Sequence, residues 1–187
     1  LFGYYSGNES AWPMGAMRMV YTENHDQNSW DGSAPDIYGE AYEAAIVLSF
    51  VGEGLPLIYN GQEAFNEKQL EFFEKDPIAW RDHPIEDLFK SLIDLKTDTT
   101  ALHNGAAGAR MIPVVNTQPE DVLSFARMDE NGGVLALFNL SPDAKTISFT
   151  DGPLAGDYVE YFSDQAITID DETELALPAW SYRIYVK

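Results

Sequence analysis

Two clusters of polar side chains follow short apolar runs in the first third of the chain. The first is TENHDQNSW, residues 22–30, directly after the apolar run at residues 17–21. An aspartate such as Asp26 can set a carboxylate opposite a developing positive charge, a histidine such as His25 can donate to a hydroxyl, and the ring of Trp30 offers an apolar face for a sugar. Taken alone, such a segment is more often turn and helix-capping chemistry.

The second cluster lies one helix later in the sequence. It is GLPLIYNGQE, residues 54–63, in which an apolar strand-like run ends in polar residues. Polar side chains at the carboxyl ends of parallel strands are where barrel enzymes place their chemistry. We expect Tyr59, Gln62 and Glu63 to act mainly as scaffold there, and Glu23 of the first cluster to face solvent or a loop.

Alternating strand-like and helical stretches must position these two clusters. Short apolar runs at 17–21 and 55–59 predict buried strands. Residues 38–51 form a stretch of helical length that is apolar around most of its circumference and ends at Gly52. Residues 84–97 repeat apolar side chains at helical spacing after a proline suited to the first helical position. The order strand, helix, strand, helix predicts a parallel sheet.

After residue 104 the helical pattern vanishes. The rest of the chain consists of short strand-like runs separated by turn residues, at 110–115, 122–128, 134–140, 145–149, 158–162 and 180–186. This spacing favours an antiparallel β-sandwich. The run at 134–140 is apolar without strict alternation, which predicts a central strand covered on both faces. We therefore expect an α/β segment, residues 1–104, followed by an all-β sandwich domain, residues 105–187.

Composition limits the classes of partner and chemistry. The chain has 187 residues, 45% of them hydrophobic, and a net charge of −20 from 11 basic and 31 acidic residues. So few cations make nucleic acid and anionic membrane surfaces poor partners, whereas a neutral polyhydroxylated substrate is compatible with the acidity. The absence of cysteine excludes disulfides, thiolate catalysis and Cys-based zinc sites. No apolar run approaches the roughly 20 residues of a membrane span.

The two clusters, in this order and at this spacing, resemble glycoside hydrolase family 13, the α-amylase family. YTENHD at residues 21–26 is similar to the motif on that family's seventh barrel strand, and LPLIYNGQE at 55–63 is similar to its eighth strand and following turn. Residues 84–105 resemble the eighth helix and the passage into the family's C-terminal β domain, and residues 177–185 resemble that domain's last strand. The resemblance implies the last two units of a partial β/α (TIM-type) barrel, followed by a β-sandwich.

By that resemblance, Asp26 is the third catalytic carboxylate, which stabilises the transition state. His25, Asn24, Trp30 and Tyr59 would bind the substrate, with Asn24 also shaping the turn. The resemblance implies no metal-binding residue and no cofactor in this chain, although calcium is common in the family and is held by earlier segments. The implied partners are an α-glucan or maltooligosaccharide and the upstream barrel segment of a parent polypeptide.

The two other carboxyl groups that a retaining glycosidase needs are expected outside this sequence. In this family the nucleophile and the general acid come from the fourth and fifth strands, which would lie upstream of Leu1. The chain does not begin with Met and shows no signal peptide, so we expect it to be processed or part of something longer. We also expect the isolated chain to be inactive, and an exported parent is favoured over a cytoplasmic one.

Three other interpretations stay open at this point. Within the family, the parent can be a transglycosylase instead of a hydrolase. In a different class, the chain can be a non-catalytic module whose β domain and aromatic platforms hold glucan or pack against other chains. A metal-dependent hydrolase around His25 and Asp26 is the least favoured, because His83 and His103 have no spacing suited to a shared metal site.

Overall fold

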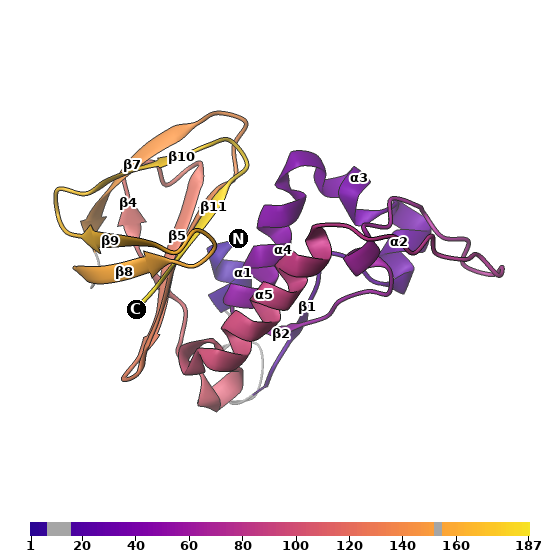
Figure 1. Cartoon of the computed structure of the whole chain (residues 1–187), viewed down its shortest axis with the longest axis horizontal. Helices are drawn as coiled ribbons and strands as arrows, with labels where there is room; N and C mark the ends of the chain where they lie inside the picture. The colour runs from indigo at the N-terminus through magenta and orange to yellow at the C-terminus, as the bar shows by residue number, and fades with distance from the viewer. Residues whose placement is uncertain (7–15, 152–154) are drawn as a thin grey trace.

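The structure is a computed structural model that describes residues 1–6, 16–151 and 155–187. Helices lie towards one end of its long axis and a β-sandwich towards the other (Figure 1). A two-stranded parallel sheet belongs to the helical side, and two antiparallel sheets form the sandwich. The architecture confirms a partial α/β segment followed by an antiparallel β-sandwich.

The helical side is built around two longer helices that the sequence predicts. Its helical elements, in chain order, are α1 (Phe2–Ser6), α2 (His25–Asp31), α3 (Ala34–Tyr38), η2 (Gly39–Ala41), α4 (Tyr42–Val51), η3 (Gln62–Ala64), α5 (Ile85–Asp98), η4 (Thr100–Leu102) and η5 (Gly105–Ala107). The helix α4 begins later than the predicted stretch at 38–51, because Gly39 has a φ of 53° and ends α3 there. The helix α5 follows Pro84 directly.

The two strands that precede the polar clusters pair in parallel. The strand β1 (Met19–Val20) lies beside β2 (Leu55–Pro56). Both are shorter than the predicted runs at 17–21 and 55–59. Within the described residues neither has a second strand partner, and a two-stranded sheet supports little regular pairing by itself. The parallel arrangement inferred from the strand–helix order is confirmed.

The sandwich consists of a six-stranded and a three-stranded sheet. Its strands are β3 (Ile112–Pro113), β4 (Val115–Asn116), β5 (Val122–Asp129), β6 (Gly132–Asn139), β7 (Lys145–Asp151), β8 (Gly156–Glu160), β9 (Gln165–Ile169), β10 (Glu174–Leu177) and β11 (Tyr182–Val186). The larger sheet has the order β3-β5-β6-β11-β8-β9 and the smaller β10-β7-β4, with antiparallel pairing throughout. The central strand predicted at 134–140 is confirmed, because β6 lies between β5 and β11 and is buried on both faces.

The sequence pattern misses two strands and joins two others. The strands β9 and β10 each lie at the edge of a sheet and are only five and four residues long, so their pattern does not stand out from the turns around them. The single run predicted at 110–115 divides into β3 and β4, which belong to different sheets. Val114 lies between them, buried, and its N–H donates to the Ser124 carbonyl at 3.1 Å.

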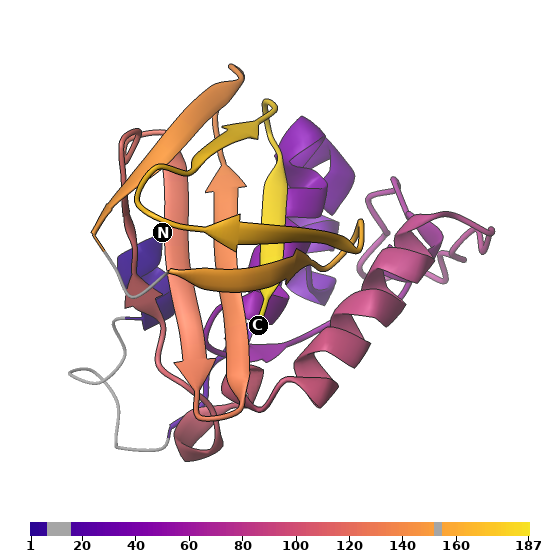
Figure 2. The same cartoon turned by 60° about the vertical axis from the view of Figure 1, so that its left-hand side comes forward.

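The helical side and the sandwich share one hydrophobic core. The helices α4 and α5 cover one face of the six-stranded sheet (Figures 1 and 2). A single buried cluster joins them to the sheet and includes Ile46, Phe50, Phe89, Leu92, Phe125, Phe138 and Ile184. A second cluster fills the space between the two sheets, with Leu135, Leu137, Ile147 and Leu177. The chain passes from α5 to β3 between residues 98 and 112, and the domain boundary near residue 104 remains our proposal.

Deleting residues 105–187 is expected to leave an insoluble remainder. The apolar faces of α4 and α5 would lose the sheet that covers them, and an exposed apolar surface of that size drives aggregation. We expect a fragment of residues 1–104 to sediment or to elute in the void volume of a size-exclusion column, under conditions in which the 187-residue chain stays in solution. A soluble, monomeric fragment would contradict this.

Two cations, the partly buried Lys96 and the buried Arg127, bind carbonyls at the carboxyl end of α4. Lys96 of α5 donates from Nζ to the carbonyls of Phe50, at 3.1 Å, and Leu102, at 2.8 Å.

Arg127 of β5 is 1% exposed. Its guanidinium donates to the carbonyls of Gly52 (2.7 Å), Val51 (3.3 Å), His103 (2.8 Å) and Ala109 (2.9 Å). Burial lowers the pKa of Lys96 to about 7 and that of Arg127 to about 10. These bonds satisfy the last carbonyls of α4 and fasten the helical side to the sandwich.

Candidate functional site

The first polar cluster folds as a helix and not as a loop. Residues 25–31 form α2, and Asn24 is its N-cap, with Oδ1 accepting from the Gln27 N–H at 2.8 Å. Asp26 adds a negative charge in the first turn, where the helix dipole favours it. Asn24 therefore shapes the local turn, as the residue pattern suggested, and presents His25 and Asp26 from the start of a helix.

A buried glutamine joins the ends of the two parallel strands. Gln62 is 2% exposed. Its Nε2 donates to Thr22 Oγ1 at 2.8 Å and to the Tyr42 hydroxyl at 3.2 Å, and its Oε1 accepts from the Tyr59 N–H at 2.7 Å. The segments that follow β1 and β2, residues 22–26 and 59–63, thus meet at Thr22 and Gln62, at the same end of the two strands. We call these two segments the rim.

The predicted site residues divide between α2 and the end of β2. The side chains of His25 and Asp26 are 70% and 64% exposed, with Nε2 and Oδ1 3.5 Å apart. Trp30 follows Asp26 by four residues, so both side chains lie on the same face of α2, and Trp30 is 63% exposed. Tyr59 comes from the rim segment after β2. Its desolvation and the nearby charge of Glu23 raise its pKa, so the hydroxyl keeps its proton.

Glu23 does not face solvent, which corrects the expectation from the sequence. It is 1% exposed, and its Oε1 accepts from Asn28 Nδ2 at 2.7 Å and from the Ala34 N–H at 3.0 Å. Burial raises the pKa of this carboxyl, although both hydrogen bonds oppose the shift. The physical reason for the burial is that Glu23 links the end of β1 to the starts of α2 and α3.

A long loop after η3 is fastened to α2 through Asn28. The Asn28 side chain donates to the Lys68 carbonyl at 3.1 Å and accepts from the Leu70 N–H at 2.8 Å. The loop carries Phe72 and Phe73, whose ring centroids lie 5.4 and 6.4 Å from that of Trp30. The sequence reasoning did not single out these two residues, although two adjacent phenylalanines between acidic residues are a signal that could have done so.

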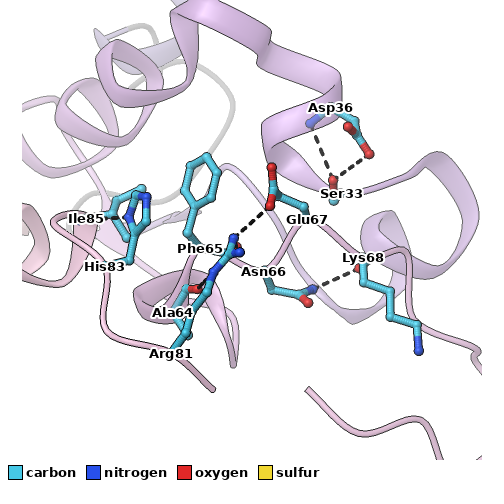
Figure 3. Close-up of polar contacts among 10 residues, drawn as sticks. All are labelled: Ser33, Asp36, Ala64, Phe65, Asn66, Glu67, Lys68, Arg81, His83 and Ile85. Atoms are coloured by element: carbon cyan, nitrogen blue, oxygen red, sulfur yellow. Dashed lines mark hydrogen bonds and ion pairs between the residues drawn. The ribbon is translucent and has the colours of Figure 1, made fainter. Parts of the chain in front are cut away.

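The other end of the same loop is held by Arg81 and His83. Arg81 donates to the Phe65 carbonyl at 2.6 Å and to Glu67 at 2.7 Å (Figure 3). The His83 ring stacks on Phe65 with centroids 4.3 Å apart, and its Nδ1 accepts from the Ile85 N–H at 3.2 Å. His83 therefore holds the start of α5.

Neither a metal centre nor a membrane-spanning helix is present in residues 1–6, 16–151 and 155–187. In that part of the chain, no group of three or more histidine and acidic side chains could hold a metal ion. No helix there is both long enough and apolar enough to cross a bilayer.

The raised pKa of the buried Glu23 carboxyl makes the stability of the fold depend on pH in a predictable direction. Its folded pKa is raised, so its contribution to stability is fully present below the ordinary value of 4.5 and is lost as pH rises through the folded pKa. Glu23→Gln keeps an oxygen acceptor and cannot ionise. We expect the difference in Tm, variant minus wild type, to increase between pH 4 and pH 7 in thermal denaturation. Parallel profiles for the two proteins would contradict this expectation.

Comparison with known proteins places the chain. No family model matches it. The α-amylase MalA of Haloarcula japonica is 32% identical over 180 residues, which is 91% of this chain and 26% of the relative. The α-amylase 2 of Dictyoglomus thermophilum is 25% identical over 164 residues, which is 81% of this chain and 26% of the relative. The chain belongs to the α-amylase family.

Solved α-amylase structures share its fold. The noncanonic maltogenic α-amylase AmyB of Thermotoga neapolitana superposes with a TM-score of 0.80 at 20% identity, covering 98% of this chain and 44% of that one. An AmyP structure in complex with maltotriose gives a TM-score of 0.69 at 13% identity, over 96% of this chain and 43% of that one. This α-amylase-family chain spans about a quarter of the length of its curated relatives. Its fold, and the small share of each relative's length that it covers, fit the C-terminal part of such enzymes.

Proposed function

We propose that this chain is the C-terminal portion of a retaining enzyme that cleaves α-1,4-linked glucose polymers. The observation that carries the proposal is the rim: the Thr22–Gln62 hydrogen bond sets the segment leading to Asp26 beside the end of β2, with Asp26 open to solvent. A structurally similar AmyP holds maltotriose, which supports a glucan or maltooligosaccharide as the ligand.

Asp26 is proposed to stabilise the transition state. Cleavage of a glycosidic bond passes through an oxocarbenium-like state, in which positive charge develops on the sugar. A carboxylate fixed in the first turn of α2 can face that charge and accept from sugar hydroxyls whose bonds strengthen as it develops. His25, 3.5 Å from Asp26, can donate to a second hydroxyl.

The remaining proposed contacts follow from how each side chain is held. The Oδ1 of Asn24 caps α2, so its contact with substrate falls to the Nδ2 donor. Tyr59 keeps its proton and can donate a hydrogen bond. Trp30, on the same face of α2 as Asp26, offers a stacking surface for a neighbouring sugar ring.

The nucleophile and the general acid are proposed to come from a preceding barrel segment of the parent protein. Val20 is 1% exposed, whereas Met19 is 55% and Leu55 38% exposed, so the parallel pair has one covered and one open face. In a parallel sheet of a β/α barrel both faces are covered. The open face supports a parent in which further strands pack against β1 and β2.

The isolated chain tests this division of labour. We expect no release of reducing sugar from starch or maltooligosaccharides by the purified 187 residues, because a retaining mechanism needs two carboxyl groups about 5–5.5 Å apart besides Asp26. We expect activity from a parent protein that includes this segment. Cleavage by the isolated chain would overturn the proposed division, and a parent inactive on every α-glucan would overturn the proposed function.

Two alternatives remain within this proposal. Products longer than the substrate would identify the parent as a transglycosylase.

The second alternative is a non-catalytic glucan-binding module. The observation in its support is the aromatic contact of Trp30 with Phe72. Retardation of the chain in starch-containing gels would support the module if it survives Asp26→Asn and is lost in Trp30→Ala. Calcium is proposed only for the parent and is tested by the effect of a chelator on its activity.

A further inference from the structure

A groove lies between α4 and the sandwich, apart from the rim. It has a volume of about 640 Å³, and none of its lining residues belongs to residues 22–26 or 59–63. Its walls are the first turn of α4, the hairpin of β8 and β9 and the turn that precedes β11. The strands β8 and β9 lie at the opposite end of the long axis from α2 (Figure 1). A ligand in this groove would therefore be bound independently of Asp26.

Aromatic rings form part of the groove wall. Phe162 is 37% exposed, and Trp180 and Tyr182 are partly exposed. The rings of Phe162 and Tyr182 meet edge to face, with centroids 5.4 Å apart, so each holds the other in place. Ligand sites combine such apolar faces with a few polar groups. One face of a pyranose ring consists of C–H groups and packs well on an aromatic face.

The polar groups of the groove include both acceptors and donors. The Glu43 carboxylate accepts one hydrogen bond from the described residues, from the Tyr182 hydroxyl at 3.5 Å, and so can accept more from a ligand. Arg183 uses Nη1 on the Tyr182 carbonyl at 2.9 Å, and the guanidinium has other donors. Glu160 is buried and its oxygens accept from backbone N–H groups, which leaves one available carboxylate, Glu43, and one available guanidinium, Arg183, of opposite charge. The set favours a neutral ligand rich in hydroxyls.

Glu160 has a supporting role in the wall. It is 7% exposed, and its two oxygens accept from the N–H groups of Ser163, at 2.8 Å, and Ile184, at 3.5 Å. These bonds hold the turn after β8 against β11. The position of the exposed Phe162 is therefore fixed before any ligand binds.

Trp180 is held in a backbone conformation that its side chain disfavours. Its φ is 50°, in the left-handed region, which is strained for a bulky residue. The turn is fastened by the Trp180 N–H on the Ser141 carbonyl at 3.1 Å, and by Asn139 Nδ2 on the Pro178 carbonyl at 2.8 Å. Glycine would adopt this φ without strain. A tryptophan kept at such a position points to a use for its ring at the groove.

We propose that this groove is a second carbohydrate-binding site, which takes a short neutral glucan chain. Trp180 and Phe162 provide the stacking faces, and Glu43 and Arg183 accept from and donate to sugar hydroxyls. The neutral sugar follows from the groove itself, while the choice of glucan rests on the proposed function. The site binds the polymer away from the point of cleavage and takes no part in the chemical step.

Titration of the 187-residue chain with maltoheptaose, by isothermal calorimetry, tests the proposal. The deciding variant is Trp180→Gly, which removes the ring and suits the observed φ of 50°. Relief of the backbone strain offsets the larger entropy of glycine in the unfolded chain, so the variant's Tm is expected to stay close to that of the wild type. We expect its affinity to fall about ten-fold or more, as for a buried aromatic contact. The matched control Trp80→Ala removes an exposed tryptophan that belongs neither to the groove nor to the rim, and it is expected to leave this affinity within about two-fold. Trp30→Ala is titrated as well, because a loss of binding in that variant would place the sugar at the rim. Glu43→Gln, at the opposite wall, is expected to weaken binding without changing Tm.

Three results would overturn the site. They are no binding of maltoheptaose by the wild-type chain, unchanged affinity in Trp180→Gly, and loss of binding only in Trp30→Ala. Equal affinity for cellohexaose would overturn the assignment to α-glucan. A peptide that binds the groove more tightly than maltoheptaose and displaces it would overturn the assignment to a carbohydrate. None of these results bears on cleavage by the parent, so the proposed function stands or falls by its own test.

Discussion

Asp26→Asn in a parent enzyme that contains this chain is expected to lower kcat/KM on maltooligosaccharides by about a hundred- to a thousand-fold. Preorganised electrostatic groups at a developing charge are each worth about this much. The substitution keeps the size of the side chain and removes the negative charge that we propose faces the oxocarbenium-like state. Because the charge matters most in the transition state, the loss is expected in kcat more than in KM. Steady-state kinetics on maltoheptaose measure both.

The matched control lies on the same helix. Asp31 is also exposed, at the last residue of α2, on the far side of Trp30 in sequence. Asp31→Asn changes the net charge by the same amount and is expected to leave kcat within about two-fold, since surface charges away from a site have small effects. Equal losses in the two variants would indicate a general charge effect. An Asp26→Asn enzyme with near-normal kcat would remove Asp26 from the mechanism.

Arg127→Met is expected to lower the free energy of unfolding of the 187-residue chain by about 3–5 kcal/mol. Methionine fills part of the same volume and leaves four backbone carbonyls, at the end of α4 and in residues 103–109, without the guanidinium donors they have now. Buried polar groups that lose a charged partner are among the most costly changes in a core. Urea denaturation followed by circular dichroism measures the change.

A neighbouring arginine serves as the control for Arg127. The Arg110 side chain is 50% exposed and lies 3.5 Å from a Glu53 oxygen. Arg110→Met is expected to cost about 1 kcal/mol, because the half-exposed arginine end of this ion pair is screened by solvent, although the Glu53 side chain is only 17% exposed. If Arg127→Met cost no more than this control, the four carbonyl contacts would contribute little to holding the helical side on the sandwich.

The sequence pattern predicts well those helices and strands whose own apolar residues, by their number and spacing, show which faces are buried. The helix α5 repeats apolar residues at helical spacing, and β6 is apolar on both faces, so each could be placed within a few residues. The meeting of the segments that follow β1 and β2, at Thr22 and Gln62, could also be predicted, because parallel strands that alternate with helices bring their carboxyl ends to one edge.

The features that sequence pattern misses depend on partners distant in the chain. The burial of Glu23 depends on Asn28 and on the start of α3, and nothing in its immediate neighbours marks it as buried. Arg127 lies within an apolar run and reaches carbonyls about 75 residues away along the chain. The helix α2 was hidden because its seven residues are mostly polar and its stability comes from capping and from the loop packed against Asn28.

The shared core between the helices and the sheet has a consequence for protein engineering. Because α4, α5, β5, β6 and β11 contribute to one buried cluster, the sandwich is not an interchangeable appendage. A chimaera that joins this sandwich to the barrel of a different family member would bring together two surfaces that did not evolve in contact with each other. Functional grafts are therefore expected only where the crossover lies ahead of α4, so that both helices travel with the sheet they contact.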